Sequence, residues 1–264
     1  MSIARRFLIP LLLLAALAPA RGQYANSYGY TFNNPVSASC NQMFWDKMNA
    51  RQTYKALLKK KGYSDAQLER LSTETMEALL AGKEGKAAET PAMAAPAATR
   101  FKPARSRLLL PALAGSLGTT AEQKKALTEV FEAGLEGYEK EAASSGLIND
   151  VAGAIAYFIG VGYYVIHDGD EPDGDGLEAI GRTLQHTLDT PPFRSIADPD
   201  KQKFYELMIG LGTYFAVAYR QAAEGGDAKA AAVIKDAASE SLKGFLNLEP
   251  STIRITREGM EIVR

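Results

Sequence analysis

The residues that could do chemistry in this sequence are few, and the most prominent group begins at one histidine. His167 is followed directly by a run of carboxylates interleaved with glycine, namely Asp168, Asp170, Glu171, Asp173 and Asp175. A histidine beside carboxylates can act as a general base or as a metal ligand. A histidine can also simply end an apolar helix, where the helix dipole favours a cation. The sequence leaves both interpretations of His167 open.

The acidic run partly matches a calcium-binding loop. Clustered carboxylates on a flexible backbone suit hard cations such as calcium. Residues 171–176 match the first half of such a loop, but its last ligand position would be Arg182, where a bidentate Glu belongs. We therefore expect a solvated turn with a helix cap at Asp175, and neither a metal site nor a cofactor.

No other motif identifies a catalytic site. The sequence contains neither the nucleophile elbow G-x-S-x-G nor the zinc-binding helix H-E-x-x-H. Its two histidines and its single cysteine, Cys40, are too few for a standard zinc or cysteine-protease site. We interpret Cys40 as a small buried thiol, with a reactive thiol or a link to another chain as alternatives. The catalytic residues stay unknown, because no spacing among the many carboxylates singles out a pair.

The element that must position His167 is the apolar stretch before it. No charged residue lies between Asp150 and His167. The sequence IGVGYY at residues 159–164 is echoed by IGLGTY at residues 209–214. The spacing of apolar residues predicts two apolar helices, the second over about 201–224, which pack as a central pair.

The glycines of these two helices allow two interpretations. A glycine inside a helix costs about 1 kcal/mol relative to alanine, so several of them indicate close approach by a neighbour, and we expect Gly212 to meet Gly160 or Gly162. The alternative is a membrane-inserting hairpin, because rows of small residues also mediate packing in lipid. A membrane span needs about 20 apolar residues. The first stretch is shorter, and Glu206 and Arg220 bound the second. A packed core pair is favoured, with no stable membrane span in the mature chain.

Further helices are predicted on both sides of this pair. Two capping-box spacings, Thr119 with Glu122 and Thr120 with Gln123, open one helix, which Gly146 ends. More amphipathic helices follow the acidic run, and the alternating tail over 252–263 predicts a hairpin. The predicted fold class is therefore all-α: a helical bundle around two apolar glycine-containing helices, with a small C-terminal β-hairpin.

Composition divides the chain into five segments. A basic start, an apolar run and a small-residue cleavage site identify residues 1–20 as a signal peptide, with cleavage near Ala20 or Gly22. The remaining segments are an extended or disordered arm (21–39), a helical segment (40–81), an Ala/Pro-rich linker (82–106) and a helical domain (107–264).

A cleaved signal peptide predicts an exported bacterial protein, located in the periplasm or outside the cell. The net charge of −1, from 30 basic and 31 acidic residues, gives no electrostatic footprint for nucleic acid, so we expect no nucleic-acid partner. A protein partner is compatible with the sequence, which does not define the oligomeric state.

The C-terminal part of the chain also carries a family resemblance. Over roughly residues 108–260 it resembles an uncharacterised family of exported bacterial proteins, described as a domain of unknown function. The resemblance rests on the apolar stretch after Asp150, its echo at residues 209–214, and the ending TREGM at residues 256–260. It implies export and a helical fold, and it assigns no activity and no functional residues.

Three functional hypotheses are compatible with these observations. The favoured one is a non-enzymatic exported protein with a binding or structural role in the envelope or outside the cell. The first alternative is an extracytoplasmic hydrolase with a site near His167, which would need a carboxylate from another helix. The second alternative is a membrane-active helical protein that uses the central helix pair. A cavity lined by His167 and the helix face bearing Tyr157 and Tyr164 would favour the hydrolase.

Overall fold

The computed structural model describes residues 54–55, 57–64, 67–68, 73–81 and 97–263. The predicted signal peptide, the predicted arm over 21–39 and Cys40 lie outside the described residues. Of the segment over 40–81, residues 57–60 and helix α4 (Thr73–Leu80) are helical. A small hydrophobic cluster in this segment contains Leu58, Leu68 and Met76.

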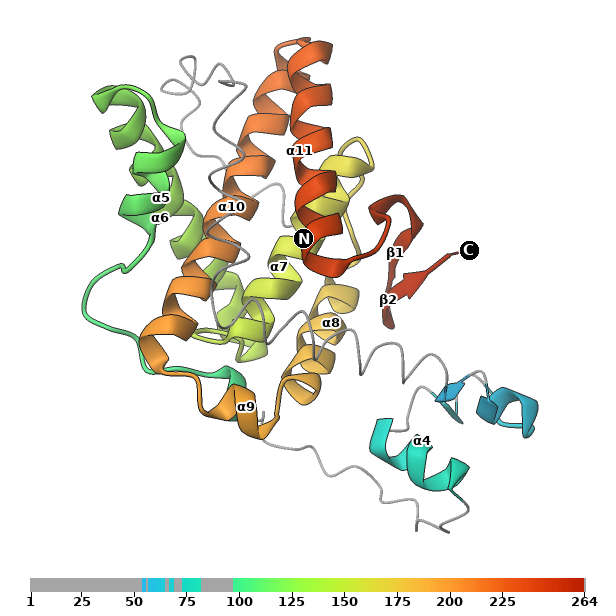
Figure 1. Cartoon of the computed structure of the whole chain (residues 1–264). Helices are drawn as coiled ribbons and strands as arrows, with labels where there is room; N and C mark the ends of the chain where they lie inside the picture. Colours follow the sequence, from blue (N-terminus) through green and yellow to red (C-terminus); the bar gives the residue numbers. More distant parts are fainter. Residues whose placement is uncertain (1–53, 56, 65–66, 69–72, 82–96, 264) are drawn as a thin grey trace.

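From residue 97 onward the chain is a bundle of α-helices that ends in a two-stranded antiparallel hairpin (Figure 1). Its elements, in chain order, are η3 (Ala97–Thr99), α5 (Leu110–Leu117), α6 (Ala121–Ser145), α7 (Val151–Ile166), α8 (Gly174–Thr187), α9 (Pro191–Arg194), α10 (Asp198–Glu224), α11 (Ala228–Leu246), η4 (Pro250–Thr252), β1 (Ile253–Thr256) and β2 (Gly259–Ile262). The all-α fold class and the C-terminal hairpin predicted from the sequence are confirmed.

Helix α7 lies at the centre of the bundle and is the apolar stretch that the sequence singles out. Most of its residues are buried, and it packs most extensively against α10, with further contacts to α8 and α11. The predicted central pair of apolar helices is therefore confirmed. Within the described residues, no helix is both long enough and apolar enough to cross a membrane.

The predicted contact between glycines of the central pair is wrong. Each glycine instead leaves room for one large side chain of a neighbouring helix: Tyr157 at Gly212, Leu177 at Gly160, Leu242 at Gly162 and Leu113 at Gly210. A Cβ on Gly212 would lie only 2.8 Å from Cε1 of Tyr157. A large side chain that fills the space beside a glycine packs the core more densely than two facing glycines would. Close packing needs atoms on both sides of a contact.

Local capping signals explain where the helices begin. Of the two capping-box spacings in the sequence, that of Thr120 and Gln123 forms at the start of α6. Helix α8 begins earlier than expected, because its cap is Asp173 and not Asp175: the Asp173 carboxylate accepts hydrogen bonds from the backbone N–H groups of Asp175 (2.9 Å) and Gly176 (3.1 Å). The turn after α7 thus supplies the residue that caps the next helix, α8.

Candidate functional site

His167 caps the carboxyl end of α7. Its backbone N–H donates to the carbonyl of Tyr163 (2.9 Å), and its ring stacks on the Tyr163 ring with 4.2 Å between centroids. The imidazole Nε2 is buried and has no hydrogen-bond partner within the described part of the chain. The His167 ring therefore packs against Tyr163 through its flat face, and Nε2 is not directed at a solvent-filled cleft.

The side chains around His167 come from three helices and form one cluster. Asp168, whose backbone is left-handed (φ 56°), accepts a hydrogen bond from Lys235 of α11 (2.7 Å) and one from the Tyr219 hydroxyl of α10 (3.5 Å). The rings of Tyr164 and Tyr219 meet edge to face at 5.9 Å. We name Tyr163, Tyr164, His167, Asp168, Tyr219 and Lys235 the carboxyl-end cluster.

The electrostatics of the carboxyl-end cluster keep Asp168 ionised. The hydrogen bond and the charge of Lys235 lower the pKa of Asp168 below its usual range. A carboxylate engaged by an ammonium group is a poor orienting partner for a neighbouring histidine that would act as a base. His167 and Asp168 are therefore neighbours in a packed surface, without the geometry of a catalytic pair.

Two further carboxylates of the acidic loop make structural contacts. Asp173 caps α8, and Asp175 pairs with Arg257 of the hairpin (3.0 Å). Arg182, which occupies the last ligand position of the incomplete calcium motif, pairs with Glu178 on its own helix. Among the described residues, no group of three or more His, Cys, Asp or Glu side chains is arranged to hold a metal ion.

A second polar group, found only in the structure, lies at the amino end of α7. Asp150 is fully buried, and its carboxylate accepts hydrogen bonds from the Thr99 hydroxyl (3.0 Å), the Gln185 amide (2.8 Å) and the backbone N–H of Ala152 (2.9 Å). The Arg100 guanidinium approaches it to 3.8 Å. The sequence offers Asn149 or Asp150 as the start of α7, and the structure shows that Asp150 is the cap and that its partners lie on η3 and α8.

Burial perturbs the ionisation of two groups at this end of the bundle. Burial raises the pKa of Asp150, and the hydrogen bonds from Gln185, Ala152 and Thr99 offset part of this shift. Burial lowers the pKa of Lys201, whose Nζ lies 5.5 Å from the ring centre of Phe193. Both groups sit among packed apolar side chains, so the charged forms are disfavoured.

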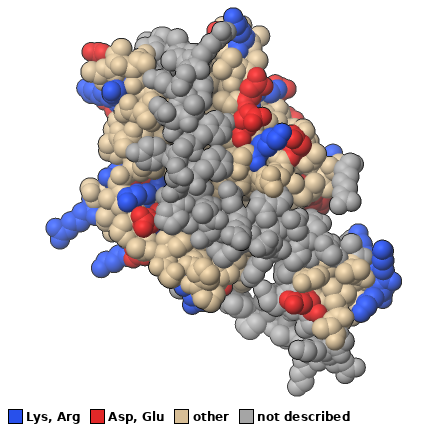
Figure 2. All heavy atoms as spheres, in the orientation of Figure 1, with Lys and Arg blue, Asp and Glu red and all other residues tan. Residues whose placement is uncertain are grey.

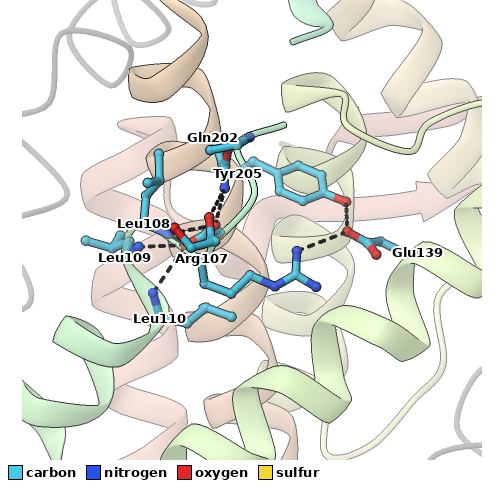
Figure 3. A network of polar contacts seen from close by, with 10 residues as sticks. Arg107, Leu108, Leu109, Leu110, Glu139, Gln202 and Tyr205 are labelled. Carbon is cyan, nitrogen blue, oxygen red and sulfur yellow. Dashed lines mark hydrogen bonds and ion pairs between the residues drawn. The ribbon is translucent and has the colours of Figure 1, made fainter. Parts of the chain in front are cut away.

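A third polar group joins α10 to the start of α5 (Figure 3). The buried Glu206 carboxylate accepts hydrogen bonds from three successive backbone N–H groups, those of Leu108 (2.9 Å), Leu109 (2.6 Å) and Leu110 (3.3 Å). Helix α5 has no side-chain cap of its own. Glu206 therefore supplies from another helix the acceptor that a helix start requires.

Gln202, one turn before Glu206, completes this anchor. Its amide accepts from the backbone N–H of Ala104 (2.7 Å) and donates to the carbonyl of Ser106 (3.0 Å) and to Glu206 (2.8 Å). The sequence signal for the pair is its spacing: two polar residues four positions apart lie on one face of α10. That signal predicts a buried polar contact but does not identify the partner segment.

Aromatic rings fill the space between these polar groups. Phe101, Tyr205, Tyr138 and Tyr157 form a chain of edge-to-face contacts with ring centres 5.1–5.8 Å apart. The Tyr205 hydroxyl donates weakly to Glu139 (3.5 Å), which also lies 3.8 Å from Arg107, as Figure 3 shows. Burial raises the pKa of Tyr157 to about 12. Tyr157 thus belongs to this interior row, and only Tyr164 of the predicted pair accompanies His167.

Acidic and basic side chains of the described residues are interspersed over the face of the bundle seen in Figure 2.

The sequence model of one protein family, described as a family of unknown function (DUF6683), matches residues 1–263. This match is longer than the stretch of residues 108–260 on which the resemblance in the sequence rests. Neither a curated protein nor a solved structure matches the chain.

Proposed function

The chain belongs to this family of unknown function, and we propose that it is a non-enzymatic exported protein that binds a partner protein, in the envelope or outside the cell. The signal-peptide features of residues 1–20 support export. Sequencing of the mature protein should find its first residue near Arg21 or Gln23.

The carboxyl-end cluster carries the proposal. It gathers three tyrosines and a histidine beside an exposed ion pair, and Tyr163, Tyr164 and His167 are each half-buried. Tyrosine is enriched in protein interfaces, because it offers a large rigid apolar area together with a hydroxyl group. The covered Nε2 and the engaged Asp168 suit recognition better than proton transfer.

The buried carboxylates support the same proposal. Asp150 and Glu206 accept their hydrogen bonds from backbone N–H groups and side chains of other segments of the chain. Such contacts hold segments together and leave no carboxylate lone pairs aimed at a substrate. The hydrolase alternative draws support only from the neighbouring positions of His167 and Asp168.

A crosslinking experiment tests the proposal. A photoreactive amino acid is placed at Tyr164, and at Ala232 as a matched control, because Ala232 is exposed on α11. Both variants are made in cells that naturally produce the protein, and crosslinked partners are identified by mass spectrometry. We expect one defined partner at Tyr164 and none at Ala232, and weaker binding of that purified partner by Tyr164→Ala.

Two outcomes would contradict the proposal. One is the same crosslinking pattern at Tyr164 and Ala232, which would mean that the cluster is not a specific interface. The other is hydrolysis of ester, peptide or glycoside substrates by the purified protein that His167→Ala abolishes. The second outcome would favour the extracytoplasmic hydrolase.

A further inference from the structure

Residues 97–109, which we name the strap, connect everything upstream in the chain to helix α5. Figure 1 shows the strap as the green loop from the base of the bundle to α5. Beyond η3 it follows an irregular path, and the side chains of residues 102–107 are exposed. Phe101 and Leu109, near its two ends, are buried. The strap is therefore held at its ends and open to solvent between them.

The amino-end anchor of the strap depends on Asp150. The Thr99 hydroxyl donates to this carboxylate (3.0 Å), and the Phe101 N–H donates to the neighbouring carbonyl of Asn149 (3.1 Å). Arg100 pairs with Asp150 as an isolated β-bridge. All of these contacts join the strap to the first turn of α7 and the residue before it.

The carboxyl-end anchor depends on Glu206 and Gln202 of α10. Together they hold the backbone from Ala104 to Leu110 through N–H and carbonyl groups (Figure 3). Glu206 alone accepts three of these hydrogen bonds. Loss of its charge would leave backbone donors of a buried turn without a strong acceptor, so this anchor rests on a single carboxylate.

One apolar contact lies between the anchors. The Phe101 ring covers Tyr205, with 5.1 Å between ring centres at an edge-to-face angle. The strap also contacts the bundle through the ion pair of Arg107 with Glu139 at 3.8 Å and through the hydrogen bond from Arg100 to the carbonyl of Gly146 (2.9 Å). Ala98 in η3 is buried in the main core. A segment that is held mainly by polar contacts and whose middle residues 102–107 are exposed opens more easily than helices buried on all sides.

We propose that the strap is a latch that opens as one unit while the α7–α10 core stays folded. Opening withdraws Phe101 and uncovers Tyr205 and the amino end of α10. Because residues 1–96 join the bundle through the strap, a partner that pulls on or binds the upstream part acts on this latch first. The two anchors open together, because each of them restricts the motion of the same short segment.

Hydrogen exchange on the full chain tests the latch. In the wild type, the backbone amides of Phe101, Ala104 and Leu108–Leu110 should share one protection level, below that of core amides in α7. Glu206→Gln should raise exchange of the strap amides by roughly tenfold, because a charge-assisted acceptor is replaced by a neutral one. Exchange of the α7 amides should not change.

Two further variants separate the latch from a general loss of stability. Glu224→Gln removes an exposed carboxylate at the far end of α10 and should leave strap exchange unchanged. Thr99→Val removes the hydroxyl at the opposite anchor and should also speed exchange at Leu108–Leu110. If Thr99→Val affects only Phe101, the anchors are independent and the proposal fails. It also fails if strap and core amides always exchange together.

Discussion

At the scale of single residues, the main lesson concerns buried carboxylates. Glu206 interrupts an apolar helix in the sequence and looks like a surface charge, yet it is 1% exposed and caps another helix. Asp150 is recognisable as a cap from its position before an apolar run, but its partners Thr99 and Gln185 lie 51 and 35 residues away. A sequence pattern reports local contacts, and contacts across such separations depend on the assembled bundle.

Replacement of Asp150 by Asn should change how stability depends on pH. The raised pKa of Asp150 means that the folded protein holds this proton more tightly than the unfolded chain does. Its contribution to the free energy of unfolding is complete below the ordinary Asp pKa of about 4 and is lost as the pH rises through the raised value. Urea unfolding at pH values from about 4 to 7 should show wild type losing stability relative to Asp150→Asn.

The control for this experiment is Asp168→Asn. Lys235 lowers the pKa of Asp168, so its contribution has the opposite sign: it is present above the ordinary pKa and is lost as the pH falls. Asp168 is exposed, so its pH dependence should be shallow. If wild type instead gained stability relative to Asp150→Asn as the pH rises, the assigned direction would be wrong. Arg100, Lys201 and Tyr138 also face Asp150 and are unchanged in this comparison.

At the scale of secondary-structure elements, periodicity and capping signals predict much of the fold. The apolar stretch becomes α7, the capping box at Thr120 begins α6, and the alternating tail forms the hairpin. The sequence analysis does not predict the short helix α5, because its start is capped by Glu206 from another helix and Pro111 is its only local start signal. The glycines of α7 and α10 correctly indicate close packing. Which side chain lies against each glycine depends on how α5, α7, α8, α10 and α11 pack together.

Leucine substitutions test the packing at these glycines. Gly212→Leu would overlap Tyr157, and Gly162→Leu would overlap Leu242, so each should destabilise the fold by about 1–3 kcal/mol. Thermal unfolding followed by circular dichroism should give midpoints lower by several degrees. Gly115→Ala on α5 is the control, because a Cβ there meets no atom within 4 Å, and its midpoint should stay the same or rise. A Gly212→Leu variant that melts like the parent would mean that α7 and α10 are not a packed pair, and the same result for Gly162→Leu would contradict the packing of α7 against α11.

The loop between α7 and α8 should not bind calcium tightly. Three of its carboxylates are used by the cap at Asp173 and by the ion pairs of Asp168 and Asp175, and Arg182 replaces the closing bidentate ligand. Calorimetric titration of chelator-treated protein should find no binding in the micromolar range typical of calcium sensors. Affinity at or below about micromolar would revive a metal-dependent role for this loop and for His167.

At the scale of the whole molecule, the sequence is more informative about organisation than about the site. The family match over residues 1–263 extends across the predicted linker, and Ala98 and Phe101 near its end are buried in the main core. The carboxyl-end cluster could be anticipated only at His167, Tyr164 and the acidic run. Tyr219 and Lys235 reach it from α10 and α11, and no local pattern connects them to α7.

Limited proteolysis tests this organisation together with the strap. The Ala/Pro-rich composition of residues 82–96 predicts a backbone without apolar partners, so trypsin should cut first at Lys83 or Lys86. Arg105 and Arg107 are exposed on the strap, but a protease must bind several residues in extended form, which the two anchors oppose. Cleavage at these two sites should therefore come later in the wild type and earlier in Glu206→Gln, and mass spectrometry of the fragments gives the order. First cuts within α6 would mean that the domain boundary is wrong, and equal strap cleavage in both proteins would mean that Glu206 does not hold the strap closed.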